Sequence, residues 1–389
     1  MGLKSKNKVV FVSNYLNHHQ LPFCKEMLKK TNDSFVFVAT TPVPSVRKQL
    51  GYHDMNDMYD FVLKAYESKE NASNAVAIIN EADIVVYGWG LEAFVKQRIK
   101  KKKITFKYTE RLYKKEPKWY TMFPRKIKYY FTHNIHKKLF LLCAGAYVAD
   151  DYARTKTFIG KAYKWGYFPE VKEYEDIDIF IDDKKENSLL WCGRIIDWKH
   201  PEYAVEVARR LKSEGYKFDL NMIGTGNLYA ELVKAVLVNN LDDCVHILGS
   251  MSPEAVREYM EKSEIFLFTS DRQEGWGAVL NESMNSACAV VANNNIGAVP
   301  YLLNDGKNGA IYHNDSVDEL YEKVKYLLDN REKRKEMGKN AYNTMKNEWN
   351  ATVATERLLI LAEELKNNKK CTLYEGGPCS VAEVHKRKK

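Results

Sequence analysis

Short apolar segments alternate with amphipathic segments of helical period along most of the chain. In the first half the apolar segments predict buried strands, and in the second half the same alternation starts again. Strands that alternate with helices form parallel sheets, so the pattern predicts an α/β fold. The expected strands are residues 9–12, 35–39, 84–87, 104–108, 139–143 and 162–167, and then 188–192, 218–223, 245–248, 265–269 and 288–292.

The alternation is interrupted by residues 169–187, an acidic segment without helical period. We interpret it as a linker between an N-terminal domain, residues 1–168, and a C-terminal domain, residues 188–348. We expect a last helix over residues 349–368 and a disordered tail over residues 369–389. Asp176 and Asp178 form a DxD motif, a pattern that binds manganese in some enzymes, but its place in a linker argues against that role.

Residues 263–301 carry the most informative pattern of the chain. A buried strand is followed by a turn with Glu274, Gly275, Trp276 and Gly277, and then by a helix predicted over residues 278–288. Loops at the carboxyl ends of parallel strands bind ligands in open sheets. N–H groups at a helix start suit phosphates, whereas carboxylates such as Glu274 and Glu282 suit hydroxyls. The pattern indicates a ligand with phosphates and sugars. The alternative is that both glutamates are solvated surface charges.

Two cations follow the first strand of the second half, in the segment GRIIDWKH. Arg194 can bind a diphosphate with two parallel hydrogen bonds, and Lys199 adds a point charge. The next two strands end in turns with Gly224, Gly226 and Gly249. These residues predict that the diphosphate lies at this edge of the second domain.

The strand exits of the first half are polar, but a GxGxxG dinucleotide motif is absent. Side chains without fixed charge follow the first strand, which suits a neutral polar substrate. Trp89 follows the third strand, where it could stack on a sugar or pack in the core. Glu110 and Arg111 follow the fourth strand and either face a ligand or form a simple ion pair. The candidates for this substrate are Asn14, His18, His19, Trp89, Glu110 and Arg111. The two adjacent histidines lack nearby third and fourth ligands, so no metal is expected.

The composition is that of a globular protein, with 45% hydrophobic and 12% aromatic residues among 389. The net charge of +9 is concentrated in residues 96–103 (KQRIKKKK) and 125–138 (RKIKYYFTHNIHKK). Aromatic residues within the second segment are typical of a helix on an anionic membrane surface. Nucleic acid could use the same charge, and a solvated basic face without a partner is the third alternative. His133 and His136 are expected at the surface.

Seven cysteines without a CxxC pair predict reduced thiols. The sequence begins without a signal-peptide pattern, and no apolar run reaches the length of a membrane span. These features predict a cytoplasmic protein, peripheral at the inner face of the membrane if the basic segments bind lipid.

Arg194, Lys199, Glu274 and Glu282, in this order on successive β/α units, carry a family resemblance. The second half resembles the family 4 glycosyltransferases, which are retaining enzymes with two facing Rossmann-like domains and a cleft between them, the B-type fold. The motifs are LLWCGRIIDWKHPEYAVE, FDLNMIGTGN, HILGSMSPE and EGWGAVLNESM, and the match covers essentially all of residues 188–347. The first half matches less specifically, although KYTERL resembles a strand exit of some bacterial polysaccharide-assembly members.

The resemblance implies roles for these residues. Arg194 and Lys199 would hold the diphosphate of a nucleotide-sugar, Glu282 the ribose hydroxyls and Glu274 the hydroxyls of the transferred sugar. Backbone N–H groups of Gly275, Trp276, Gly277 and Ala278 would complete the phosphate site, with the base near Gly249 and Met251. The last helix would pack back on the first domain.

The resemblance further implies a metal-independent transfer with retention, without a cofactor, to a saccharide or lipid-linked acceptor in bacterial cell-surface polysaccharide synthesis, such as capsule or O-antigen. The sequence leaves open a nucleotide-sugar epimerase or a phosphorylase of the same fold. A basic nucleic-acid-binding or scaffold protein is the alternative from another class, although no nucleic acid is expected because the basic segments lie apart from the diphosphate residues.

Overall fold

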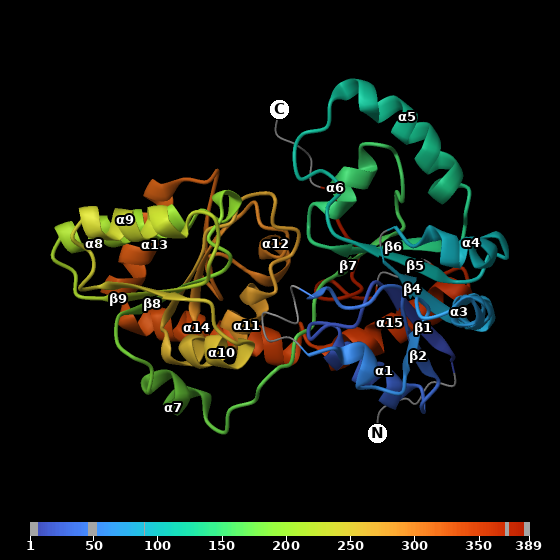
Figure 1. Cartoon of the computed structure of the whole chain (residues 1–389), viewed down its shortest axis with the longest axis horizontal. Helices are drawn as coiled ribbons and strands as arrows, with labels where there is room; N and C mark the ends of the chain where they lie inside the picture. The colour runs from blue at the N-terminus through green and yellow to red at the C-terminus, as the bar shows by residue number, and fades with distance from the viewer. Residues whose placement is uncertain (1–6, 46–52, 89, 370–372, 385–389) are drawn as a thin grey trace. The chain divides into compact units, whose positions relative to one another are not determined.

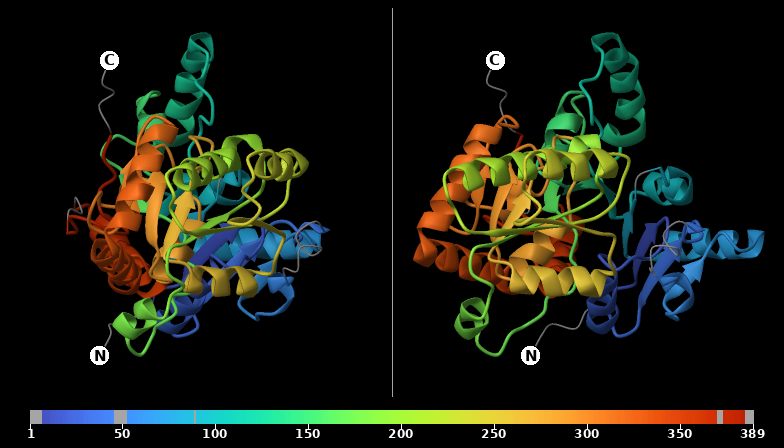
Figure 2. Two further views of the ribbon diagram at one scale, coloured as in Figure 1. Left: turned by 90° about the vertical axis from the view of Figure 1, so that its left-hand side faces the viewer. Right: turned by 60° about the vertical axis from the view of Figure 1, so that its left-hand side comes forward.

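The computed structural model describes residues 7–45, 53–88, 90–369 and 373–384. The chain forms two compact units (Figure 1). Unit 1 comprises Met1–Glu170 and Trp349–Lys389, and unit 2 comprises Val171–Glu348. Each unit contains one parallel sheet with helices on both faces (Figure 2).

The sheet of unit 1 has seven strands in the order β3-β2-β1-β4-β5-β6-β7. The chain reverses direction across the sheet between β1 and β4, which are paired in parallel. Six of the strands are those that the apolar runs predict. The additional strand, β3, has only three half-buried residues, so it lacks the apolar run that would reveal it. The strands are β1 (Val9–Ser13), β2 (Phe35–Ala39), β3 (Val62–Lys64), β4 (Ile84–Tyr87), β5 (Thr105–Thr109), β6 (Leu139–Ala144) and β7 (Ala162–Trp165).

The helices of unit 1 pack on both faces of this sheet. Helices α3, α4 and α6 contribute to an apolar core with Val10, Val12 and Val85 of the strands. On the other face α1 packs against α15, the last helix of the chain. The elements are α1 (Leu21–Lys30), a 3-10 turn (Met55–Asp57), α3 (Lys69–Glu81), α4 (Glu92–Lys100), α5 (Trp119–Tyr129), a π-helical turn (Tyr130–Asn134), α6 (Val148–Ala153) and α15 (Ala351–Lys366).

The C-terminal segment corrects one expectation. Residues 373–384 were expected to belong to a disordered tail, but part of this segment lies beside β7 and is hydrogen-bonded to it. Lys164 donates its N–H to the carbonyl of Ser380 at 2.7 Å, and Cys379 donates to the carbonyl of Lys164 at 2.8 Å. Both Cys379 and Ser380 are buried, and Val381 forms a β-bridge with Tyr163. The unpaired edge of the sheet therefore orders this segment, a tertiary effect that composition does not reveal.

The sheet of unit 2 has six strands in the order β10-β9-β8-β11-β12-β13, with the reversal between β8 and β11. Helices α8, α9 and α13 lie on one face and α10, α11 and α14 on the other (Figure 1). The strands are β8 (Ser188–Cys192), β9 (Asp219–Ile223), β10 (Val245–Gly249), β11 (Ile265–Phe268), β12 (Ala289–Asn293) and β13 (Ala310–Tyr312). The helices are α7 (Ile177–Asp182), α8 (Pro201–Ser213), α9 (Tyr229–Val238), α10 (Pro253–Lys262), α11 (Val279–Asn285), α12 (Val299–Leu302), α13 (Val317–Asp329) and α14 (Arg331–Asn347).

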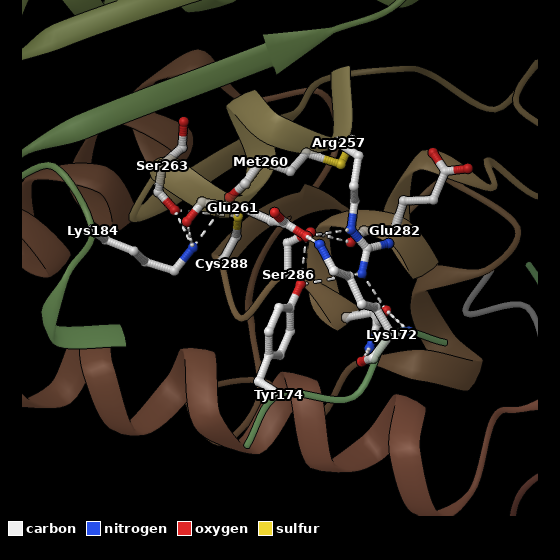
Figure 3. A network of polar contacts seen from close by, with 11 residues as sticks. Lys172, Tyr174, Lys184, Arg257, Met260, Glu261, Ser263, Glu282, Ser286 and Cys288 are labelled. Atoms are coloured by element: carbon white, nitrogen blue, oxygen red, sulfur yellow. Dashed lines mark hydrogen bonds and ion pairs between the residues drawn. The ribbon is translucent and has the colours of Figure 1, made fainter. Parts of the chain in front are cut away.

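The segment interpreted as a linker is tied to unit 2 from residue 171 onward (Figure 3). The ammonium of Lys184, which is buried, donates to the carbonyls of Met260, Glu261 and Ser263 at 2.8–3.1 Å. It thereby caps the C-terminal end of α10, where carbonyls lack helical partners. The hydroxyl of Tyr174 donates to Glu261 at 2.9 Å. Asp176 accepts from two N–H groups at the start of α7, so the first residue of the DxD motif is a helix cap, and Asp178 forms an ion pair with Lys339.

Both sheets have the strand order of a Rossmann-like domain, 3-2-1-4-5-6 in chain order, with one additional strand in unit 1. The predicted α/β class with two Rossmann-like domains is therefore confirmed. Among the described residues Cys24, Cys143, Cys192, Cys244, Cys288 and Cys379 are free thiols.

Candidate functional site

The candidate phosphate-binding residues of unit 2 lie where β8 and β11 end side by side. The strand order reverses between these two strands, so the loops that follow them diverge and leave room for a ligand. Arg194 and Lys199 follow β8, and Glu274 follows β11. Residues 75 to 80 positions apart in the sequence are therefore brought to one edge of the sheet.

Hydrogen bonds join the two loops directly. The hydroxyl of Thr269 donates to the carbonyl of Lys199 at 2.6 Å, and the N–H of Asp271 donates to the carbonyl of Trp198 at 3.0 Å. Thr269 in turn accepts from the indole N–H of the buried Trp191 at 2.8 Å. The backbone that carries Lys199 is therefore fixed by the core of unit 2.

The ammonium of Lys199 forms an ion pair with Glu274 Oε2. Both side chains are only 13% exposed, and the hydroxyl of Ser270 donates to the same carboxylate oxygen at 3.1 Å. The guanidinium of Arg194 lies 5.5 Å from the ring centre of Trp198, and the Lys199 ammonium lies 4.7 Å from it. One indole therefore holds both cations near each other. Our sequence analysis missed Trp198, although its place between the two cations in GRIIDWK was a signal.

The glycines at the ends of β8 and β9 permit close contact between two loops. A Cβ atom on Gly224, which has φ +146°, would lie 1.8 Å from the carbonyl oxygen of Gly193, and one on Gly226 would lie 2.1 Å from the carbonyl oxygen of Ile195. Gly224 also donates to the carbonyl of Gly249 at 2.7 Å. The predicted glycines thus shape the loops around Arg194. Met251 is partly buried two residues after Gly249.

The turn after β11 depends on Gly277. This residue has φ +89°, and a Cβ atom on it would lie 2.4 Å from the ring of Phe268. The side chain of Trp276 is fully buried, and its indole N–H donates to Asn281 at 2.8 Å. Trp276 therefore presents only its backbone to a ligand, together with Gly275 and Ala278, and its side chain anchors the turn in the core.

Glu282 lies in the first turn of α11. Burial raises the pKa of its carboxyl group to about 7, against the opposing effect of Arg257. The guanidinium of Arg257 bonds to Asn285, and the Glu282 carboxylate is directed away from this network (Figure 3). Burial also raises the pKa of the Cys192 thiol to about 12, an effect that Glu282 increases and Lys199 opposes. Glu282 and Lys199 thus have opposite effects on the pKa of Cys192 at the end of β8.

Unit 1 contains a cavity of about 560 Å³ at the corresponding edge of its own sheet. The loops after β1, β4 and β5 form it, so it also lies at the reversal of strand order. Most of its lining residues carry a polar group, and they include three of the predicted substrate residues, Asn14, Glu110 and Arg111. The other lining residues are Ser13, Tyr15, Asn17, Gln20, Gly88, Leu91, Tyr108, Thr109, Leu112, Lys114 and Tyr167.

Tyr167 joins the cavity to the histidine pair. Its hydroxyl donates to Glu110 Oε1, and its ring stacks on His19 with centroids 5.6 Å apart. The rings of His18 and His19 lie 3.7 Å apart. His19 thus contacts Tyr167, which lines the cavity, whereas His18 and His19 are not among the lining residues of this cavity. Trp89 lies outside the described residues.

The two basic segments differ from expectation. Arg98 is fully buried and donates to four carbonyls and to Thr105, because it joins α4 to the ends of α3 and β5. Lys103 donates to the carbonyl of Asn80 at 2.6 Å. Residues 96–103 are thus partly structural instead of a continuous surface charge. His133, expected at the surface, is only 4% exposed and lies 3.1 Å from the Lys107 ammonium.

Residues 174–344, nearly all of unit 2, match the family model of the group 1 glycosyl transferases. The chain is 31% identical over 126 residues to the amylovoran biosynthesis glycosyltransferase AmsK of Erwinia amylovora, covering 31% of each chain. It is 29% identical over 164 residues to the N-acetylgalactosamine-N,N'-diacetylbacillosaminyl-diphospho-undecaprenol 4-alpha-N-acetylgalactosaminyltransferase of Campylobacter jejuni, covering 42% of each chain. In both cases the chain spans less than half the length of the curated relative.

The structure is similar to that of Anabaena HepE in complex with UDP, with a TM-score of 0.68. The two chains are 12% identical, and the match covers 92% of this chain and 100% of HepE, which shows a common fold. The resemblance to glycosyltransferases that the sequence motifs indicate is confirmed. Within the described residues, none of the helices has the length and apolar character needed to cross a membrane.

Proposed function

From the family match of unit 2, we propose that this chain is a retaining, metal-independent glycosyltransferase. It moves a sugar from a nucleoside-diphosphate sugar to a saccharide or lipid-linked saccharide in cell-surface polysaccharide synthesis. The observation that carries the proposal is the convergence of Arg194, Lys199 and Glu274 at the reversal of strand order in unit 2. The lipid-linked acceptor of the Campylobacter relative and the polysaccharide product named for the Erwinia relative support the acceptor class.

The donor binds to unit 2 in this proposal. Arg194 and Lys199 contact the diphosphate, because fixed cations beside a desolvated turn stabilise phosphate charge. Glu282 accepts hydrogen bonds from the ribose hydroxyls, and Glu274 accepts them from the hydroxyls of the transferred sugar. The UDP in the HepE complex makes uracil the first base to test.

The chemical step breaks the bond between the anomeric carbon and the diphosphate oxygen. Negative charge then develops on the diphosphate, where Arg194 and Lys199 stabilise it without rearrangement. The acceptor hydroxyl attacks the same face of the sugar, and its proton passes to the departing phosphate oxygen. Glu274 orients the sugar and does not attack it. The two cations supply the positive charge, so the proposal needs no metal.

The acceptor binds to the cavity of unit 1. Its carboxylate, guanidinium and amide side chains, from Glu110, Arg111 and Asn14, offer the donors and acceptors that sugar hydroxyls require. A transferase has two substrates, and each unit of this chain offers one polar site at the edge of its sheet.

A thermal-shift screen of nucleotide-sugars followed by a transfer assay tests the proposal. A donor at 100 times its Kd should stabilise the protein by about 2.7 kcal/mol. With that donor and a lipid-linked saccharide acceptor, nucleoside diphosphate should be released only when the acceptor is present. Arg194→Ala should slow this release about 100-fold or more. Unchanged release by the variant would contradict the site assignment.

The same assay separates the alternatives. An epimerase would convert the donor sugar without acceptor-dependent release of the diphosphate, and a phosphorylase would require inorganic phosphate. A nucleic-acid-binding protein would bind DNA or RNA in a salt-sensitive way and would show no stabilisation by any donor.

A further inference from the structure

Helix α5 of unit 1 exposes large apolar side chains to an unusual degree. None of its residues is buried. Trp119 is 85% exposed and Phe123 is 71% exposed, and Ile127 and Phe131 continue the same spacing of four residues along α5 and the π-helical turn. This spacing places the four side chains along one face of the helix. We call Trp119, Tyr120, Phe123, Ile127, Tyr130 and Phe131 the aromatic face; each is at least 47% exposed.

The opposite side of the helix anchors it to unit 1. Tyr129 stacks on the buried Tyr152 with ring centroids 5.8 Å apart, and the guanidinium of Arg125 lies 5.0 Å from the ring centre of Tyr113. His133, in the turn after α5, packs on Phe158. Inward and outward sides are thus clearly separated, so the aromatic face does not belong to the core of unit 1.

The charge around the aromatic face has one sign. The sequence contains no Asp or Glu between Glu116 and Asp150. Lys118, Lys126 and Lys128 are exposed on α5 or directly before it. Figure 1 shows α5 on the outer side of unit 1, away from the sheet. An apolar face with aromatic residues and with lysines in the same segment complements an anionic lipid surface, whose headgroups pair with lysines and whose interface accepts aromatic rings.

We propose that the aromatic face of α5 inserts into the interface of an anionic membrane. Trp119 and Phe123 enter the region between headgroups and acyl chains, and Lys126 and Lys128 contact lipid phosphates. The sequence already indicated residues 125–138 for this role. The structure adds the exposed face of α5 and argues against the other basic segment, because Arg98 and Lys103 make internal hydrogen bonds. The proposal does not depend on the proposed reaction, because membrane binding by α5 requires no particular donor or acceptor.

Co-sedimentation of the full chain with vesicles tests the proposal. Vesicles that contain anionic phospholipid should bind the protein, and purely neutral vesicles should bind it at least about tenfold more weakly. The double variant Lys126→Gln/Lys128→Gln should lose about fivefold in affinity for each lysine. The double variant Trp119→Ser/Phe123→Ser should also bind at least about tenfold more weakly, at low and at high salt, because its loss is apolar.

A matched control distinguishes this face from general surface hydrophobicity. Leu237 and Val238 of α9 are 57% and 69% exposed, and the variant Leu237→Ser/Val238→Ser should bind vesicles like the wild type. Vesicles with brominated acyl chains should quench part of the tryptophan fluorescence, and Trp119→Phe should remove most of that quenching. Equal loss in both serine variants, or quenching that persists in Trp119→Phe, would overturn the proposal.

Two further measurements separate other causes. If the chain binds single-stranded DNA but not vesicles, or if light scattering shows a dimer that the variant Trp119→Ser/Phe123→Ser dissociates while vesicle binding is absent, the face has another partner and the proposal is wrong. The donor should stabilise the variant Trp119→Ser/Phe123→Ser and the wild type equally. If the variant loses vesicle binding but still binds the donor, the result tests the membrane proposal alone. If the wild type does not bind the donor, the result counts against the proposed reaction and not against the membrane proposal.

Discussion

Lys199 and Glu274, from the loops after two neighbouring strands of unit 2, form an ion pair in which each side chain is only 13% exposed. The pair holds the Lys199 ammonium beside Trp198 and Phe268. Each of these largely buried charges needs a partner of opposite sign, and Glu274 is the partner of Lys199 until a phosphate arrives. The ion pair should therefore contribute both to the stability of unit 2 and to donor binding, and substitutions can separate these two contributions.

Lys199→Met should lower the transfer rate about 100-fold or more, because it removes one fixed cation from the leaving diphosphate. It should also destabilise unit 2 by roughly 3 kcal/mol, since Glu274 would remain partly buried without its partner. The measurements are nucleoside-diphosphate release and chemical denaturation.

The double variant Lys199→Met/Glu274→Gln is the control for that experiment. It should recover most of the stability, because no unpaired charge remains, but it should not recover the transfer rate. If activity returned together with stability, Lys199 would have a structural role only.

Gly277→Ala should destabilise unit 2 and weaken donor binding. The added Cβ would lie 2.4 Å from the ring of Phe268 in a residue with φ +89°, so the turn that presents the N–H groups must move. We expect a loss of about 1–3 kcal/mol in the free energy of unfolding and at least a tenfold higher Kd for the donor. Calorimetry of donor binding and thermal unfolding would measure both.

Gly306 provides the matched control. It has φ +74°, but a Cβ atom on it would meet nothing within 4 Å. Gly306→Ala should therefore cost about 1 kcal/mol from backbone strain and leave donor affinity unchanged. Equal effects of the two substitutions on donor binding would show that the contact with Phe268 is unimportant.

The fold could be predicted largely from the sequence because both sheets are parallel and buried on both faces. Their strands are then continuous apolar runs, such as Leu139–Ala144, that contrast with the helices. Strands β3 and β13 and the segment that includes Cys379 were not predicted this way. All three lie at sheet edges, and their conformation depends on pairing with a neighbouring strand.

Residue type and spacing led to the candidate donor residues of unit 2, whose roles stay a prediction. Arg194, Lys199 and Glu274 lie at adjacent strand ends because β8 and β11 are neighbours where the strand order reverses, although β9 and β10 lie between them in the sequence. The distinction between Trp198, which contacts both cations, and Trp276, which is buried, required the structure. Charge composition was similarly misleading for Arg98, since a buried arginine and a solvated one look the same in a basic run.

The buried His133 should make the protein less stable in mild acid. Burial and the neighbouring Lys107 lower the pKa of His133 to about 3. The unfolded state, with a pKa near 6.5, binds a proton that the folded state does not, so stability is lost as the pH falls below about 6.5. At pH 5 this loss amounts to about 2 kcal/mol relative to pH 7.5.

Denaturation curves of the wild type and of His133→Gln at pH 7.5 and pH 5 measure this contribution. The variant should lose about 2 kcal/mol less than the wild type over that range. His53 is exposed, so His53→Gln should show the wild-type pH dependence. The same pH dependence in all three proteins would contradict a neutral buried His133.

Arg98 should be essential for the stability of unit 1. Arg98→Met would leave the carbonyls of Ile79, Ala82, Asp83 and Ile104 without this donor, which lies 2.6–2.9 Å from all four in the intact protein. We expect a loss of about 3 kcal/mol or more. Lys96→Met in the same helix concerns an exposed side chain and should change stability by about 0.5 kcal/mol at most. Similar unfolding midpoints for both variants would contradict the internal role.

Glu110 should determine acceptor use and not donor binding. Its carboxylate accepts from Tyr167 and lines the cavity of unit 1, whereas the donor residues all belong to unit 2. Glu110→Gln should lower kcat/KM for the acceptor about 10–100-fold, as expected for losing a charged hydrogen-bond acceptor of about 1.5–3 kcal/mol. Tyr167→Phe should act in the same direction, because it removes the hydroxyl that orients the carboxylate. The Kd for the donor should stay constant in both variants, and Glu70→Gln, at an exposed position of α3, should behave like the wild type. An altered donor Kd with unchanged acceptor kinetics would place Glu110 outside the acceptor site.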